Sequence, residues 1–194
     1  MTYKAVMCLK FIVYYCPRAE RVLKMDDDSF VNVAALREFL KTRPAYSNNE
    51  IMCDVMTGTG PIRKKNSKWY VTREEYPDNS YPTYCSGWVA MFTPKTASQL
   101  YKAAQNASYF WVDDVFLYGM VAAKVGGLKL TDISRRILPT KKVLKGYCGN
   151  STFLFAGPNV NADVIKSCWM QLRAKDRTVN SSSGKRNTPV ARNW

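Results

Sequence analysis

Val22-Leu23-Lys24-Met25-Asp26-Asp27-Asp28-Ser29-Phe30-Val31-Asn32 places three consecutive carboxylates between two apolar segments. Residues 22–25 predict a short buried strand, and residues 33–41 have the spacing of a helix with Asn32 as its N-cap. The acids then occupy a turn from strand to helix. In open α/β sheets ligands bind outside the carboxyl ends of the strands. The stretch therefore predicts an α/β fold with a candidate site at this turn.

Three adjacent carboxylates repel one another, so a partner that compensates their charge is expected. Oxygen ligands on a tight loop suit a hard divalent cation such as Mg²⁺ or Mn²⁺, which often bridges protein carboxylates to substrate phosphates. The alternative is a solvated acidic turn at the start of a helix, because runs of charge are commonly solvated. The apolar strand before the acids and Phe30 after them favour a binding site.

Length and composition indicate one folded domain with a real core. The chain has 194 residues, of which 46% are hydrophobic, so it is not disordered by composition. Its net charge of +14 favours an anionic partner such as a nucleotide, a nucleic acid or an acidic membrane surface. The basic residues are scattered and no nucleic-acid motif stands out, so a basic nucleic-acid-binding module is the weakest hypothesis.

The chain has six cysteines, without a C-x-x-C pair, and no histidine. A zinc site is therefore not expected, whereas disulfides in an oxidising compartment are compatible with an even number of cysteines. The sequence does not choose among the 15 possible pairings of six cysteines. No transmembrane run or signal peptide is visible.

The remaining pattern alternates helices and strands. We expect a helix at 3–15, strands near 51–57, 68–71 and 85–92, and a helix opened by Thr93 and Pro94. Further strands are expected near 128–133, 142–148 and 152–156, with a last helix from Asn161 to 172. A helix leading directly into the strand at 22–25 is half of a βαβ unit, so we expect the chain to begin inside its domain. The expected domain covers residues 1–172, and residues 173–194 are expected to form a basic, disordered tail.

A second candidate site is Phe110-Trp111-Val112-Asp113-Asp114-Val115-Phe116-Leu117-Tyr118-Gly119. Asp113 or Asp114 lies where a helix running to about Val125 would begin, and an acid there is ordinarily an N-terminal cap. Between aromatic residues it is also a candidate for a partly desolvated carboxylate that takes a proton.

Three stretches together resemble the β-1,3-galactosyltransferase and N-acetylglucosaminyltransferase family, glycosyltransferase family 31. They are Tyr15-Cys16-Pro17 with the acidic stretch that follows, Tyr81-Pro82-Thr83-Tyr84-Cys85-Ser86-Gly87, and Val112-Asp113-Asp114-Val115 with Gly119 after it. Their order and spacing are more specific than each stretch alone, and the resemblance covers roughly residues 3–130.

The resemblance implies a partial GT-A (Rossmann-like) nucleotide-sugar-binding sandwich that lacks its first strands. It implies that Asp26 and Asp28 bind Mn²⁺, and that Asp26, Asp27 and Asp28 face the donor diphosphate. Asp114 would be the catalytic base. Tyr84, Gly87 and Asp113 would line the acceptor side.

The implied activity is inverting transfer of galactose or an N-acetylhexosamine from a UDP-sugar to a glycan hydroxyl in β-1,3 linkage, for protein glycosylation. The partners would be a UDP-sugar and a glycan or glycoprotein, with no nucleic acid. The full-length parent is expected on the lumenal side of the Golgi membrane, held by an anchor absent from this chain. The alternative is a catalytically inactive remnant that binds a glycan or a partner enzyme.

Overall fold

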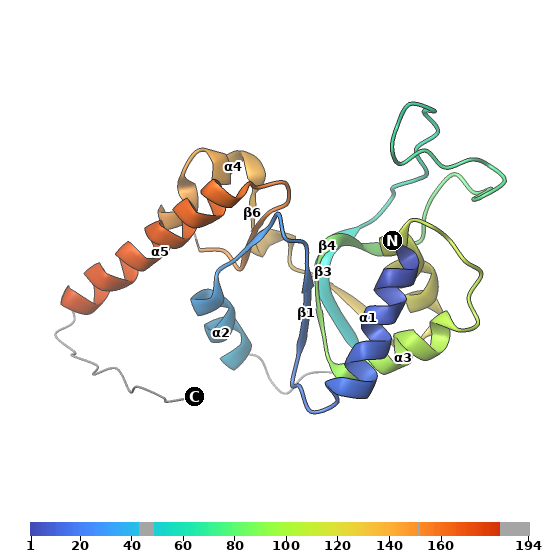
Figure 1. Ribbon diagram of the computed structural model, residues 1–194, viewed down its shortest axis with the longest axis horizontal. Helices are drawn as coiled ribbons and strands as arrows, with labels where there is room; N and C mark the ends of the chain where they lie inside the picture. Colours follow the sequence, from blue (N-terminus) through green and yellow to red (C-terminus); the bar gives the residue numbers. More distant parts are fainter. Residues whose placement is uncertain (43–48, 151, 183–194) are drawn as a thin grey trace. The chain divides into compact units, whose positions relative to one another are not determined.

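The computed structural model describes residues 1–42, 49–150 and 152–182 (Figure 1). The chain forms two compact units. Unit 1 comprises Met1–Asp26 and Glu38–Arg135, and unit 2 comprises Asp27–Arg37 and Arg136–Trp194. The boundary between the units passes through the acidic stretch, so Asp26 belongs to unit 1 and Asp28 to unit 2.

Unit 1 is built on a four-stranded mixed sheet. Its strands are β1 (Val22–Met25), β3 (Glu50–Met56), β4 (Tyr84–Phe92) and β5 (Lys129–Asp132), in the order β1-β4-β3-β5. β4 pairs antiparallel with β1 and β3, whereas β3 and β5 are parallel. A register shift interrupts the β3–β4 ladder between Cys53 and Val55.

The helices of unit 1 pack against one another and against β4. α1 (Thr2–Tyr15) lies beside α3 (Pro94–Ala104), and both contact the π-helix η1 (Val115–Val121), which also contacts β4 (Figure 1). A short 3-10 helix, η2 (Ala122–Lys124), continues η1. Thr93 caps α3, with its side chain accepting a hydrogen bond from the Thr96 backbone N–H, and Pro94 follows at the first helical position, as predicted.

The core of unit 1 is apolar and crosslinked. Leu9 of α1, Phe92 of β4, Leu100 of α3 and Val121 of η1 belong to one buried cluster. Within the same cluster a disulfide joins Cys53 of β3 to Cys85 of β4. This covalent link closes a long excursion of the chain between β3 and β4, which includes residues 57–83 (Figure 1).

Unit 2 contains a smaller three-stranded sheet in the order β2-β7-β6. Its strands are β2 (Phe30–Val31), β6 (Ile137–Pro139) and β7 (Phe155–Gly157), and its helices are α4 (Thr140–Leu144), the 3-10 helix η4 (Tyr147–Asn150) and α5 (Ala162–Ser182). The first turns of α2 (Val33–Lys41), which the unit boundary divides, also belong to it. A second disulfide joins Cys148 to Cys168.

The predicted α/β class is confirmed, with mixed sheets. Asn32 accepts a hydrogen bond from the Ala35 N–H at the start of α2, and Asn161 accepts one from the Val164 N–H at the start of α5, as their predicted capping roles require. Among the described residues no helix is both long enough and apolar enough to span a bilayer.

Two predicted strands are wrong. Residues 142–144 fall in α4 and residues 147–148 in η4, with a turn between them, instead of a strand. Of the α4 side chains only Val143 is buried, whereas Lys141, Lys142 and Leu144 are exposed, so the segment lacks the alternating burial of a strand. Residues 68–71 make only one bridge, between Tyr70 and Ile62, because the chain turns there with the Tyr70 N–H bonded to the Ser67 carbonyl.

The last helix is longer than predicted. α5 ends at Ser182 and not at residue 172, so part of the segment expected to be disordered is helical. Residues 183–194 of the predicted tail lie outside the described part of the chain. β2 and β6 were not predicted, since two or three residues are too few to show an alternating pattern.

Candidate active site

Asp26 stands at the end of β1. Its backbone N–H donates to the Trp88 carbonyl of β4 at 2.9 Å and so extends the ladder by one residue. Its carboxylate accepts a hydrogen bond from the Lys24 ammonium, with Nζ and Oδ1 2.6 Å apart, and the side chain stays 47% exposed. The acid is thus held in place on one side and open to solvent on the other.

Lys24 links Asp26 to the neighbouring strand β4. Besides Asp26 its ammonium donates a hydrogen bond to the Gly87 carbonyl oxygen. Sequence reasoning did not name Lys24 as a site residue, although a charged side chain between Leu23 and Met25 in an apolar strand was a usable signal.

Asp114 sits at the N-terminus of η1, where it caps the helix. Its Oδ1 accepts from the Val115 N–H at 2.8 Å, and its Oδ2 accepts from the Gly87 N–H at 3.2 Å. Burial raises the pKa of this carboxyl above its ordinary value, and the nearby Asp113 charge adds to the increase. A raised pKa makes Asp114 a stronger base than an exposed aspartate.

Gly87 connects the two acids. Its carbonyl accepts from Lys24 while its N–H donates to Asp114. A Cβ added at Gly87 would lie 3.0 Å from the Asp114 Cβ and 3.4 Å from its Oδ2. Asp26, Lys24, Gly87 and Asp114 therefore form one connected polar network within unit 1, which we call the acid network.

If Asp114 is the base that the sequence resemblance implies, Gly87→Ala is expected to lower kcat/KM about tenfold, because the new methyl group displaces the Asp114 carboxylate by a few tenths of an ångström and small misplacements of a reacting group are costly. A matched control is Gly126→Ala, since a Cβ there would have nothing within 4 Å. Steady-state kinetics of both variants checks this, and equal activities would contradict it.

Tyr84 begins β4 and packs against η1. A Cβ added at Gly119 would lie 3.1 Å from the Tyr84 Cβ, which shows how closely the strand and the helix approach. Burial raises the pKa of the Tyr84 hydroxyl, and the Asp114 charge raises it further. Its ring contacts Tyr81 edge to face at a centroid distance of 6.1 Å, and burial raises the pKa of Tyr81 to about 12. Both phenols therefore stay protonated at neutral pH and are available as hydrogen-bond donors.

Asp113 lines a cavity of about 400 Å³ in unit 1. The cavity wall includes Lys24, Asp26, Gly87 and Asp113 on its polar side and residues of α1 on its apolar side. The fold thus brings three of the predicted site residues, Asp26, Gly87 and Asp113, to one cavity of unit 1. Asp114 joins them through its bond to Gly87.

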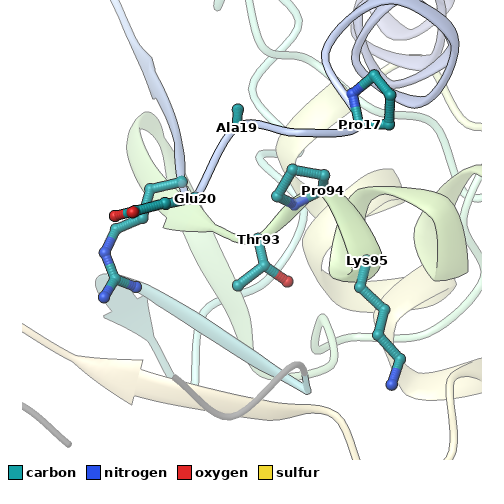
Figure 2. A pocket seen from close by; sticks show the side chains of 7 residues that line it. Pro17, Ala19, Glu20, Thr93, Pro94 and Lys95 are labelled. Atoms are coloured by element: carbon teal, nitrogen blue, oxygen red, sulfur yellow. The ribbon is translucent and has the colours of Figure 1, made fainter. Parts of the chain in front are cut away.

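A second cavity of unit 1, of about 390 Å³, lies at the opposite end of the β1–β4 pair (Figure 2). Pro17, Ala19 and Glu20 precede β1, and Thr93, Pro94 and Lys95 open α3 (Figure 2). It contains no predicted site residue.

Asp27 and Asp28 belong to unit 2. Asp28 accepts a hydrogen bond from the Ser29 hydroxyl at 3.4 Å, and its carbonyl accepts from the Val160 N–H at 2.9 Å. Asp27 is exposed. The metal and donor-binding roles of these acids stay predictions.

Within residues 1–42, 49–150 and 152–182 no three or more acids and cysteines are grouped closely enough to hold a metal ion by themselves. Carboxylate oxygens, such as those of the half-exposed Asp26, nevertheless suit a hard cation that takes its other ligands from phosphates and water. The donor chemistry therefore fits Mn²⁺ or Mg²⁺ bound together with a diphosphate.

Comparison with known proteins identifies the family. The family model described as Galactosyltransferase matches residues 1–133. A lactosylceramide 1,3-N-acetyl-beta-D-glucosaminyltransferase of Xenopus tropicalis is 35% identical over 127 residues, which are 65% of this chain and 33% of that protein. Beta-1,3-galactosyltransferase 5 of Mus musculus is 33% identical over 129 residues, which are 64% of this chain and 40% of that protein.

Beta-1,3-galactosyltransferase 1 of Mus musculus is 32% identical over 126 residues, 65% of this chain and 38% of that protein. The matched part of the chain thus spans about a third to two fifths of the length of these relatives. The matched region contains Asp26, Gly87, Asp113 and Asp114. The chain belongs to the galactosyltransferase family, glycosyltransferase family 31.

Proposed function

We propose that this chain carries catalytic machinery of an inverting hexosyltransferase. The enzyme would move galactose or an N-acetylhexosamine from a UDP-sugar to a glycan hydroxyl and form a β-1,3 linkage in protein glycosylation. The observation that carries the proposal is the acid network, in which the buried Asp114 is tied through Gly87 and Lys24 to Asp26. The fold in this proposal is of the GT-A class.

Asp114 acts as the general base in this mechanism. The acceptor hydroxyl gives its proton to the carboxylate as its oxygen attacks the anomeric carbon, and the bond from that carbon to the UDP oxygen breaks on the opposite face. The anomeric configuration is inverted because attack and departure occur on opposite faces. The bonds from the Val115 and Gly87 N–H groups fix the carboxylate in position before the acceptor arrives.

Mn²⁺ is the proposed cofactor, with Asp26 and Asp28 as its protein ligands and Asp27 beside the donor. When bound, the metal supplies positive charge that stabilises the departing diphosphate. The Lys24 ammonium adds a fixed positive charge next to Asp26, so this chain's own residues contribute to the same stabilisation.

Tyr84, Gly87 and Asp113 line the acceptor side in the proposal. Asp113 reaches the cavity that also contains Asp26 and Gly87, and its carboxylate can accept hydrogen bonds from sugar hydroxyls. The Tyr84 phenol, protonated at neutral pH, can donate one.

We further propose that the complete protein works on the lumenal side of the Golgi membrane, to which it is attached by an anchor. The two disulfides, Cys53–Cys85 and Cys148–Cys168, support this location because disulfides persist in oxidising compartments.

The test is calorimetric titration of the chain with UDP, with and without Mn²⁺, followed by incubation with UDP-galactose, UDP-N-acetylglucosamine and UDP-N-acetylgalactosamine. We expect Mn²⁺-dependent binding, and we expect Asp28→Asn to weaken it at least tenfold through loss of a metal ligand. Asp163→Asn, which changes an acid in the first turn of α5, is the matched control. Glycan binding without transfer from any of the three donors would instead support the inactive alternative.

A further inference from the structure

Two indole rings lie against each other in unit 1. Trp69, on the excursion between β3 and β4, and Trp111, just before η1, are parallel within 5° with centroids 6.0 Å apart. Atoms of stacked rings touch at about 3.5–4.0 Å, so a 6.0 Å separation means that the rings are offset and leave part of each face uncovered. Trp69 is 40% exposed and Trp111 is half-buried.

The segment that carries Trp69 is held rigidly. The Arg63 guanidinium donates hydrogen bonds to four backbone carbonyls of that segment, those of Val71, Thr72, Tyr76 and Asp78, at 2.6–3.0 Å. The Tyr81 N–H also donates to the Thr59 carbonyl at 2.8 Å, which closes the base of the excursion. An exposed indole on a fixed backbone loses little further entropy when it binds a ligand.

A continuous series of ring contacts leads from this pair to Tyr84, three residues before Gly87 on β4. Trp111 contacts Phe110 at a centroid distance of 6.4 Å, Phe110 contacts Tyr81 at 6.0 Å, and Tyr81 contacts Tyr84 at 6.1 Å. Trp111 also precedes Asp113 by two residues in the chain. The indole pair is thus linked by ring contacts to Tyr84, which lies on the acceptor side of the proposed site.

Exposed, fixed indoles suit a sugar ring. One face of a β-linked hexopyranose presents several axial C–H groups, whose partial positive charge is attracted to the negative face of an aromatic ring. Lys68 places its ammonium over the Trp69 ring, 5.2 Å from the ring centroid. This exposed side chain has to swing aside when a sugar stacks on that face, and its ammonium can then donate hydrogen bonds to the sugar hydroxyls.

We propose that Trp69 and Trp111, flanked by Lys68, form a stacking subsite for a hexopyranose of the acceptor glycan beyond the sugar that is modified. The inference rests on the proposed function and extends it, because it gives the enzyme a preference for oligosaccharide acceptors over single sugars. Trp69 and Trp111 then set acceptor length, and Asp114 performs the chemistry.

The test compares Trp69→Ala with the wild type on two acceptors, methyl β-galactoside and a tetrasaccharide of two N-acetyllactosamine units. We expect KM for the tetrasaccharide to rise about tenfold, because the variant loses an aromatic contact that the ligand would bury. The value of kcat and the KM values for methyl β-galactoside and the UDP-sugar should stay within about twofold of the wild type. Trp69→Phe should restore most of the affinity. Trp169→Ala is the matched control, because it removes a comparably exposed indole, 48% exposed, from α5. It should leave kcat and all of these KM values unchanged.

Intrinsic fluorescence separates this inference from the proposed function. Titration with the tetrasaccharide in the absence of UDP should change the fluorescence of the wild type and Trp169→Ala at concentrations about tenfold lower than those that Trp69→Ala requires. That result, with no transfer from any UDP-sugar, would keep the subsite and remove the transferase activity. An unchanged tetrasaccharide KM in Trp69→Ala, an equal rise for both acceptors, or a Trp69-dependent response to UDP alone would overturn the subsite.

Discussion

Asp114→Asn is expected to lower the rate of sugar transfer by a factor of about 10²–10⁴, the usual contribution of a general base. The amide cannot take the proton of the acceptor hydroxyl, although it occupies the same space as the carboxylate. UDP binding in the presence of Mn²⁺ should stay within about threefold of the wild type, since the proposed metal ligands are other residues. Initial rates and calorimetric titration measure the two quantities.

The same substitution has a structural cost that must be measured alongside. Asp114 accepts hydrogen bonds from two backbone N–H groups on different oxygens, whereas asparagine has one acceptor oxygen. One N–H loses its partner, so we expect the free energy of unfolding to fall by about 1–3 kcal/mol. Assays below the melting temperature of the variant remove this effect. Retained turnover in a folded Asp114→Asn protein would exclude Asp114 as the base.

Removing the disulfide of unit 1 is expected to have the largest effect on stability. Cys53 and Cys85 are 32 residues apart in the chain, and for a loop of this length the loss of the crosslink costs about 3–4 kcal/mol in the chain-entropy account. The double variant Cys53→Ala, Cys85→Ala should lose about this free energy of unfolding. Denaturant unfolding measured by tryptophan fluorescence gives the value.

The variant should also lose transferase activity at temperatures where it is still folded. Cys85 precedes Gly87 by two residues on β4, so a looser start of this strand disturbs the bond from Gly87 to Asp114. Cys8→Ser, at an exposed free cysteine, is the control and should unfold like the wild type. A double variant as stable as the Cys8→Ser protein would show that the crosslink does not stabilise unit 1.

The sequence predicted the elements that have strong local signals. The strand before Asp26, the helix capped by Asn32 and the helix opened by Thr93 and Pro94 were found because apolar spacing and capping residues act over a few neighbouring positions. The helix predicted at Asp114 was also correct in place, but its π-helical form was not foreseen. That form depends on how η1 packs against β4 and α3, which no local pattern encodes.

The sequence predicted the acidic residues of the candidate site, but not the hydrogen bonds that connect them. Asp26 and Asp114 stood out as charges beside apolar and aromatic residues, and both have a defined place in the acid network. Lys24 did not stand out, and Gly87 was expected only on the acceptor side, because the way in which these two residues join the acids depends on the pairing of β1 with β4. The stacking of Trp69 on Trp111 likewise joins residues 42 positions apart in the sequence.

The most direct test of the central claim is the anomeric configuration of the product. The chain would be incubated with Mn²⁺, α-linked UDP-galactose or UDP-N-acetylglucosamine, and the N-acetyllactosamine tetrasaccharide, and the new linkage would be read by proton NMR. We expect a β-linked sugar on a 3-hydroxyl, formed by the wild type and not by Asp114→Asn. An α-linked product, or equal product from Asp114→Asn, would contradict inversion by the Asp114 carboxylate.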